Sequence, residues 1–226
     1  MAINLRLYFT IFTFLFLPTL LHADSHPFNI IDKPISYGAD RKKLTIEYMR
    51  IHYGGNPKNV EIIPRAIVLH WTGNGAFMPI WNLFNRTHLG SGRKDIAGGG
   101  SVQVSAHFIV DRDGKIYRIM PENWMARHCI GLNHLAIGIE NIGDGNKFPL
   151  TEEQLKANVA LIRYLVKKHT TITHLFGHHE YRKMEKHPYF KELDPKYRTN
   201  KIDPGDAFMT MVRQKIIALS LKKPPE

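Results

Sequence analysis

Apolar residues along the chain occur in short runs of the kind that form strands. Residues 66–70 (AIVLH), 136–142 (AIGIENI) and 172–176 (ITHLF) have the length and composition of buried strands. Residues 106–110 and 115–120 flank an Asp-Gly turn, a pattern that predicts a β-hairpin. Together these segments predict the strands of a sheet.

Other segments have the periodicity of helices. One extends from Asp40, a candidate cap, to the Gly54-Gly55 pair, although residues 45–51 would also suit a strand. Residues 76–89 also have a helical pattern. Residues 206–219 predict a closing helix, because their apolar side chains recur at helical spacing.

The clearest helix begins at Thr151. Gln154 completes a capping box with Thr151, and apolar residues then recur on one face: Leu155, Val159, Ile162 and Val166. That face predicts a helix that covers a sheet. Strands interspersed with helices, together with one hairpin, predict an α/β fold of the α+β mixed kind, with a central mixed β-sheet flanked by helices.

The connecting segments differ in composition. Residues 24–39 predict an extended lead-in, because they contain proline and glycine with little periodicity. Residues 90–103 (GSGRKDIAGGGSVQ) are glycine-rich and polar, which is typical either of a mobile loop beside a site or of an ordinary surface loop. Residues 181–200 form a long polar connection rich in Lys and Arg.

Residues 5–21 form a nearly uninterrupted apolar run whose only charge is Arg6. The run leads into Leu-His-Ala, which predicts a secretory signal peptide over residues 1–23 and a protein that is exported, periplasmic or secreted. A membrane anchor is the alternative. However, Pro18 interrupts the run, and its apolar core is shorter than the roughly 20 residues of a spanning helix. We therefore expect no membrane span after the signal is cleaved.

Composition narrows the class of partner. The 226 residues suit a single well-formed core. The formal net charge is +11, and loss of Arg6 with the signal leaves +10, so an anionic partner is expected. No nucleic-acid motif is present and the positive charge is scattered, so we expect no nucleic acid; an anionic cell-wall polymer suits an exported protein better. Cys129 is the only cysteine, which excludes an intramolecular disulfide and a cysteine-rich zinc site.

Three polar residues stand where apolar strands end or just beyond them. His70 ends AIVLH, His178 follows ITHLFG, and Asp203 lies in KIDPG. Two imidazoles and one carboxylate suit a catalytic zinc ion, since three protein ligands leave a fourth position for water or substrate. The chain has 13 histidines, however, so an incidental pair is the alternative.

Two further residues are candidates for proton transfer and charge stabilisation. Glu140 interrupts an apolar strand, which favours a carboxylate facing a pocket, although alternation on a half-exposed strand would give the same pattern. Lys201 would point to the same side as Asp203 in an extended segment, where it could stabilise an oxyanion; otherwise it is a solvated lysine.

Neighbouring histidines leave the ligand set ambiguous. His179 follows His178 directly, and only the Gly-His register favours the first of the two. His174 and His178 have the spacing of a helical zinc motif, but no Glu follows His174 and the segment has the pattern of a strand. A metallopeptidase of the HExxH type is therefore disfavoured.

Five segments over roughly residues 65 to 210 carry a specific resemblance: AIVLHWTGN, SAHFIVDRDGKIYRIMPEN, ARHCIGLNHLAIGIENIGDG, LFGHHE and KIDPGDAF. In this order they resemble the zinc-dependent N-acetylmuramoyl-L-alanine amidase family, which includes the peptidoglycan recognition proteins. The resemblance implies one amidase-like catalytic domain over residues 61–221, preceded by a lead-in segment and helix over residues 24–60.

The resemblance also implies roles for individual residues. It implies a Zn²⁺ ion held by His70, His178 and Asp203, with Glu140 as general base and Lys201 as the stabiliser of the transition state. The implied reaction is hydrolysis of the amide between N-acetylmuramic acid and L-alanine, in intact peptidoglycan or in a released muropeptide, whose sugar either has or lacks the anhydro form.

Four further positions qualify the resemblance. His128 falls where the family often has a histidine lining the substrate groove, so it is a candidate substrate contact. His107 would support the site or merely pack. The gap before Asp203 is long and contains another Asp-Pro pair at Asp194, but Asp203 alone has Lys two residues before it and Gly two residues after. Ala106 stands where some relatives have a tyrosine, which would leave more of the proton transfer to Glu140.

Two other functions remain open. Family members without a complete zinc site bind peptidoglycan without cleaving it, so a binding module is the alternative. A basic structural protein of the cell wall, whose histidines are ordinary, is the other.

Overall fold

The computed structural model describes residues 28–225; the expected signal peptide, residues 1–23, lies outside the described residues. The elements in chain order are β1 (Ile30–Asp32), α1 (Ala39–Tyr53), β2 (Ala66–Trp71), α2 (Phe77–Asn85), η1 (Ala97–Gly99), β3 (Phe108–Val110), β4 (Ile116–Arg118), β5 (Ala136–Asn141), α3 (Glu152–Lys168), β6 (His174–Gly177), η2 (His178–Lys186), α4 (Asp206–Lys215) and η3 (Ile217–Leu219), where η denotes a 3₁₀ helix.

The strands form one mixed sheet in the order β1-β4-β3-β5-β2-β6. β3, β5, β2 and β6 run parallel to one another, whereas β4 is antiparallel to β3 and forms the predicted hairpin with it. The parallel register of β2 and β5 sets His70 opposite Glu140. The α/β class and the mixed sheet flanked by helices are confirmed.

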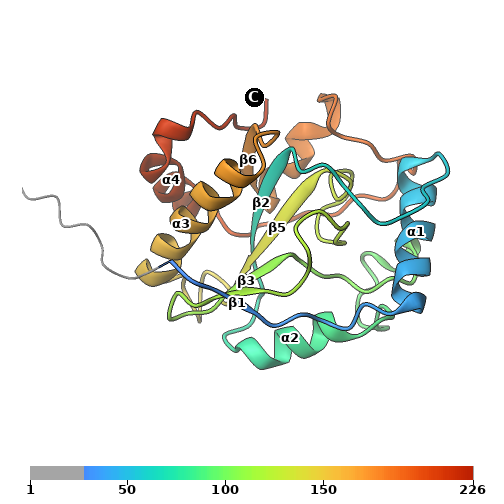
Figure 1. Cartoon of the computed structure of the whole chain (residues 1–226), viewed down its shortest axis with the longest axis horizontal. Helices are drawn as coiled ribbons and strands as arrows, with labels where there is room; N and C mark the ends of the chain where they lie inside the picture. Colours follow the sequence, from blue (N-terminus) through green and yellow to red (C-terminus); the bar gives the residue numbers. More distant parts are fainter. Residues whose placement is uncertain (1–27, 226) are drawn as a thin grey trace, which may run out of the picture.

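The two faces of the sheet carry different layers of the core. Ile67 and Leu69 of β2 belong to a buried cluster that includes α3 and α4, and Figure 1 shows these two helices side by side. Ala66 and Val68 point to the opposite face, where they join a cluster that includes Tyr48 of α1. Because side chains alternate along a strand, His70 shares the face of Val68 and lies on the α1 side.

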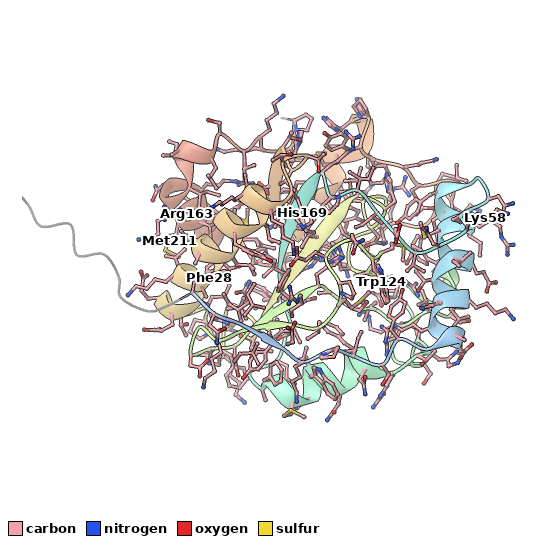
Figure 2. The ribbon with its side chains drawn as sticks, viewed as in Figure 1. Phe28, Lys58, Trp124, Arg163, His169 and Met211 are labelled. Carbon is pink, nitrogen blue, oxygen red and sulfur yellow. The ribbon has the colours of Figure 1, made fainter. Side chains whose placement is uncertain are left out.

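Local signals fix the helix that covers the sheet. The Thr151 hydroxyl accepts a hydrogen bond from the Gln154 backbone N–H at 3.1 Å, and the Gln154 side chain accepts one from the Thr151 N–H at 3.0 Å. The predicted capping box is therefore confirmed at the start of α3. Phe28 packs against Tyr164 of this helix, with ring centroids 5.4 Å apart, and Figure 2 shows Phe28 beside α3.

Two predicted helix boundaries were wrong. Gly38, not Asp40, is the N-cap residue of α1; Asp40 lies in the first turn, and its carboxylate pairs with His88. The helical conformation of α1 excludes the alternative of a strand over residues 45–51. α2 ends at Asn85 rather than at residue 89, because Arg86 is extended and the buried Arg41 guanidinium donates to the Phe84 and Arg86 carbonyls at 2.7 and 3.0 Å.

Two connecting segments contain structure that their composition did not predict. The lead-in segment includes the edge strand β1, which pairs with β4. The polar connection over residues 181–200 begins inside η2, a 3₁₀ helix that continues to Lys186. Within residues 28–225, no helix combines the length and apolarity needed to cross a membrane.

Candidate metal centre

The candidate site lies at the carboxyl ends of three neighbouring parallel strands. His70 and Glu140 are each the fifth residue of their strands, and His178 follows β6 directly. Asp203 reaches the same place from the segment before α4. These four residues line one cavity together with Lys201.

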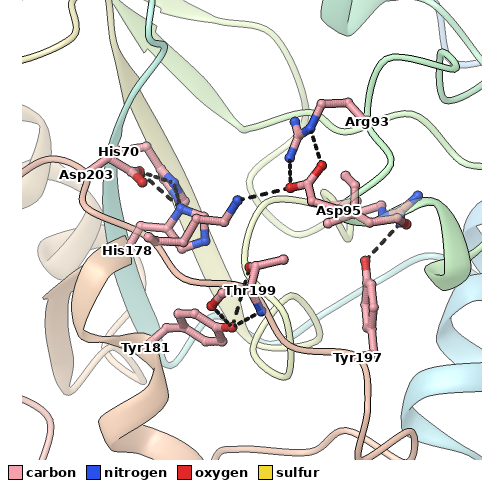
Figure 3. A network of polar contacts seen from close by, with 11 residues as sticks. His70, Arg93, Asp95, His178, Tyr181, Tyr197, Thr199 and Asp203 are labelled. Carbon is pink, nitrogen blue, oxygen red and sulfur yellow. Dashed lines mark hydrogen bonds and ion pairs between the residues drawn. The ribbon is translucent and has the colours of Figure 1, made fainter.

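Three of the predicted ligand atoms converge. His70 Nδ1 lies 3.0 Å from His178 Nδ1 and 3.2 Å from Asp203 Oδ2, and His178 Nδ1 lies 3.0 Å from the same oxygen (Figure 3). A tetrahedral zinc ion with bonds of about 2.0 Å needs ligand atoms about 3.3 Å apart. The three side chains are all buried. Their spacing and chemistry therefore fit a single zinc ion.

The electrostatics of the cluster also suit a cation. Burial lowers the pKa of His178 to about 4, which keeps its imidazole neutral at pH 7. Burial alone would raise the pKa of the Asp203 carboxyl, but the adjacent His178 and His70 hold it well below its usual range. In the described part of the chain, no Lys or Arg pairs with Asp203; its partners are the two histidines. The cluster thus presents a buried carboxylate that is not paired with any Lys or Arg among the described residues.

A chain of hydrogen bonds sets the orientation of the His70 ring. His128 Nε2–H donates to the Ala136 carbonyl at 3.1 Å, so in a neutral ring His128 Nδ1 is an acceptor. That nitrogen lies 3.0 Å from His70 Nε2, which must then be the donor. The remaining His70 nitrogen, Nδ1, keeps its lone pair toward His178 and Asp203. Gly138 makes this arrangement possible, because a Cβ there would lie 2.7 Å from the His128 ring.

His107 occupies a different position. Its Nδ1 accepts from the Gly138 backbone N–H at 3.0 Å, and its Nε2–H donates to the Trp124 carbonyl at 2.8 Å. The ring is fully buried, and burial lowers its pKa to about 4. Both nitrogens are used inside the fold, so the structure brings His107 beneath the site as a packing residue and His128 beside the ligand cluster.

Glu140 is the least satisfied polar group of the site. Its Oε2 atom is buried without a hydrogen-bond partner among the described residues. Burial raises the pKa of its carboxyl to about 7, although the nearby His70 counteracts part of that rise. A carboxyl group with this pKa and an unused oxygen facing a cavity can accept a proton at neutral pH.

Lys201 lies on the same side of its segment as Asp203. Ile202 between them is 74% exposed, whereas the Lys201 side chain is 17% exposed. The side chains of this segment therefore alternate, the arrangement in which Lys201 and Asp203 share one side. The Lys201 ammonium lies 3.6 Å from Asp95 Oδ2, on the glycine-rich segment of residues 90–103.

The structure separates the two adjacent histidines. His179 Nδ1 donates to the Asp203 carbonyl at 3.0 Å, and His179 Nε2 lies 2.9 Å from Asp206 Oδ1. Neither ring nitrogen is directed at the cluster formed by His70, His178 and Asp203. Of the pair, His178 is therefore the residue that the fold brings into the ligand set.

The sequence analysis did not predict which residues of the glycine-rich segment line the cavity. Arg93 and Ile96 line the cavity, as do Arg127 and Tyr197 from elsewhere in the chain. The signal for Arg93 was present: it opens a charged Arg-Lys-Asp triplet inside a segment otherwise rich in glycine. No comparable signal marked Arg127 or Tyr197.

Comparison with known families gives a consistent result. The family model described as N-acetylmuramoyl-L-alanine amidase matches residues 59–206. Over 65 residues the chain is 35% identical to Peptidoglycan recognition protein 3 of Mus musculus, a match that covers 29% of this chain and 19% of that protein. The chain thus aligns with only about a fifth of that relative's length.

Solved structures resemble the whole fold. The endolysin N-acetylmuramoyl-L-alanine amidase LysCS from Clostridium intestinale URNW is 25% identical with a TM-score of 0.54, over 88% of this chain and 99% of that one. The amidase LysC from the same organism is 25% identical with a TM-score of 0.53, over 86% and 99%. A selenomethionine derivative of AmpD shares the fold at 21% identity and a TM-score of 0.53, over 83% and 94%.

Proposed function

Because this chain belongs to the N-acetylmuramoyl-L-alanine amidase family, we propose that it is a zinc-dependent hydrolase of the amide between N-acetylmuramic acid and L-alanine. The observation that carries the proposal is the convergence of His70, His178 and Asp203 beside a Glu140 oxygen that has no hydrogen-bond partner among residues 28–225. Its substrate would be peptidoglycan or a muropeptide released from it. If residues 1–23 are a signal peptide, the enzyme acts in the periplasm or after secretion.

The residues proposed to hold zinc are His70 and His178, through Nδ1, and Asp203, through Oδ2. When bound, the ion supplies Lewis acidity, which acidifies water and polarises an amide carbonyl. His128 acts as a positioning residue, because its acceptor nitrogen keeps the proton of His70 on Nε2.

Glu140 is proposed as the general base. Its carboxylate takes a proton from water as the water oxygen bonds to the amide carbonyl carbon. The carbonyl oxygen gains negative charge in that step, and the Lys201 ammonium stabilises it. Glu140 then returns the proton to the nitrogen as the C–N bond breaks, which leaves a muramoyl carboxylic acid and a free L-alanine amine.

A peptidoglycan-binding module without catalysis is the second candidate, and the mouse relative named as a peptidoglycan recognition protein favours it. A complete set of ligands and a candidate base argue for the enzyme. A basic structural wall protein would have no need of a buried metal cluster.

The test is digestion of purified peptidoglycan and of anhydro-muropeptides, with and without prior removal of zinc by a chelator. We expect one zinc ion per chain, and products with a new L-alanine amino terminus, identified by mass spectrometry. Zinc-loaded protein that binds peptidoglycan but releases no such product would support the binding module. Absence of bound zinc, together with absence of hydrolysis, would favour the structural protein.

A further inference from the structure

The glycine-rich segment of residues 90–103 forms one wall of the candidate site. Arg93 and Ile96 of this segment line the same cavity as His70 and Glu140. From the sequence, this segment could be either an ordinary surface loop or a loop beside a site. Its position along the cavity favours a loop beside the site.

An ion-pair chain connects this wall to Lys201. The Arg93 guanidinium donates twice to Asp95, from Nε to Oδ1 and from a terminal nitrogen to Oδ2, both at 3.0 Å. Asp95 Oδ2 in turn lies 3.6 Å from Lys201 Nζ. Among residues 28–225, Asp95 is the carboxylate that pairs with Lys201.

The base of the segment is fixed rather than free. The buried Arg127 guanidinium donates to the carbonyls of Gly100 and Val102 at 2.9 and 2.6 Å, and to that of Ile96 at 2.7 Å. His52 Nε2 lies 3.0 Å from the Gly99 carbonyl. These contacts hold the backbone that follows Asp95, so Asp95 is presented from a defined position.

The same arginine reaches the other side of the cavity. Arg127 donates to the Tyr197 hydroxyl at 2.9 Å, and Tyr197 lies on the segment that leads to Lys201. A Cβ at Gly99 would lie 2.3 Å from the Tyr197 ring, so the two segments are in close contact. The Asp95–Lys201 distance is therefore set by a shared buried anchor.

We propose that Asp95 is a positioning residue, an inference that rests on the proposed amidase function. Asp95 holds the Lys201 ammonium near the position at which the amide carbonyl oxygen gains negative charge during hydrolysis. A lysine side chain loses rotamer entropy when it is fixed, and a carboxylate at its end selects one orientation before substrate arrives. Arg93 orients Asp95 by its paired hydrogen bonds. Arg93 also partly neutralises the negative charge of Asp95, so the positive charge of Lys201 stays available to the substrate.

The test compares Asp95→Ala and Asp95→Asn with Asp113→Ala as the matched control. Asp113 pairs with Lys115 at 2.7 Å and is 51% exposed, close to the 45% of Asp95, but it lies on the β3–β4 turn away from the cavity. We expect kcat to fall about tenfold in both Asp95 variants with KM changed less than twofold. Asp113→Ala should keep wild-type values, and Asp95→Glu should recover part of the loss.

A double-mutant cycle identifies the route of the effect. In a Lys201→Ala background, Asp95→Ala should lower kcat by less than twofold further, because the group that Asp95 positions is gone. A multiplicative loss would overturn the proposal, as would wild-type kcat in Asp95→Asn. A change in KM alone would instead make Asp95 a substrate contact.

Two readouts other than turnover complete the test. Zinc content should stay at the wild-type level in every Asp95 variant. Muropeptide affinity, measured by calorimetry in a Glu140→Gln background, should be unchanged by Asp95→Ala; a tenfold loss there would contradict a positioning role. If the wild-type protein itself does not hydrolyse the amide, the proposed function fails, whereas an inert Asp95 in an active enzyme refutes only this inference.

Discussion

Two glutamates, Glu122 in the loop after β4 and Glu140 on β5, differ in how the protein surrounds a carboxyl group that is removed from solvent. The Glu122 side chain is 4% exposed and surrounded by donors: His169 Nε2 at 2.6 Å, Lys168 Nζ at 2.9 Å and an Arg118 nitrogen at 3.2 Å. Figure 2 shows His169 near the sheet, where α3 ends. Glu140, beside the ligand cluster, has a buried oxygen with no partner in the described chain.

The pKa values follow from these surroundings. Burial acts to raise the pKa of Glu122, but the hydrogen bonds and charges of His169 and Lys168 together lower it by more than burial raises it. The net shift of the pKa is therefore downward. At Glu140 burial prevails and raises the pKa to about 7. A carboxylate with all its hydrogen bonds made, such as Glu122, stabilises the fold. A carboxylate with an unbonded buried oxygen, such as Glu140, can accept a proton near neutral pH.

The largest effect is expected at the ligand cluster. His178→Ala should abolish both zinc binding and hydrolysis, since removing one of three ligands leaves an incomplete site. His179→Ala is the control and should retain zinc, because its ring faces the Asp203 backbone and Asp206. Metal analysis of the purified variants measures this. Retained zinc in His178→Ala together with lost zinc in His179→Ala would reverse the assignment.

Glu140→Gln should lower kcat by about 10²- to 10⁴-fold, the usual contribution of a general base, while zinc content stays at one ion per chain. The amide is nearly isosteric with the acid, so folding should be preserved. Steady-state kinetics and metal analysis on the same sample separate the two effects. Wild-type turnover in this variant would exclude Glu140 as the base.

His128→Ala should weaken zinc binding by about 10- to 100-fold, because the His70 Nε2–H loses its acceptor and the ring loses its fixed orientation. His174→Ala is a suitable control, since it removes a buried histidine that lies outside the cluster. Competition with a chromophoric chelator measures the affinities. Equal affinity in the two variants would contradict the role of His128.

Glu122→Gln should lower the free energy of unfolding at pH 7 by about 1.5 kcal/mol and leave kcat unchanged. The folded pKa of Glu122 lies below its ordinary value of 4.5, so its contribution is present above pH 4.5 and is lost as pH falls through the folded pKa. Urea titrations of wild type and variant should therefore converge in acid. A constant difference down to the lowest pH would show that packing, not charge, is responsible.

The smallest effect is expected at the solvent edge of the same region. Asp32 pairs with Arg118 at 2.7 Å but is 63% exposed, so Asp32→Asn should cost less than about 1 kcal/mol. The loss should shrink further in 1 M salt. Thermal unfolding at low and high salt measures it; a loss larger than that of Glu122→Gln would break the distinction between buried and exposed partners.

Features encoded locally could be predicted from the sequence. Thr151 and Gln154 are three residues apart, and their capping box needs nothing beyond the helix that it starts. The strand that contains His70 and the strand that precedes His178 could be recognised from their apolar runs for the same reason. Together with the family resemblance, these signals brought forward all three residues of the cluster.

Features that depend on distant partners could not be predicted. The three residues of β1 become a strand only because β4 offers an edge to pair with. The early end of α2 depends on Arg41, which is 43 residues before the Phe84 carbonyl that it binds. Asp95 became a candidate positioning residue only because the fold places its carboxylate 3.6 Å from the Lys201 ammonium. No spacing between the two residues along the chain predicts this contact.

The cluster is also assembled late in the life of the polypeptide. His70 and His178 are 108 residues apart, and Asp203 follows another 25 residues along the chain. Synthesis proceeds from the amino end, so a nascent chain carries its first candidate ligand long before it carries the last. A chain terminated before Asp203 therefore lacks one of the three residues proposed to hold zinc, and we predict that it neither binds the ion nor hydrolyses the proposed substrate.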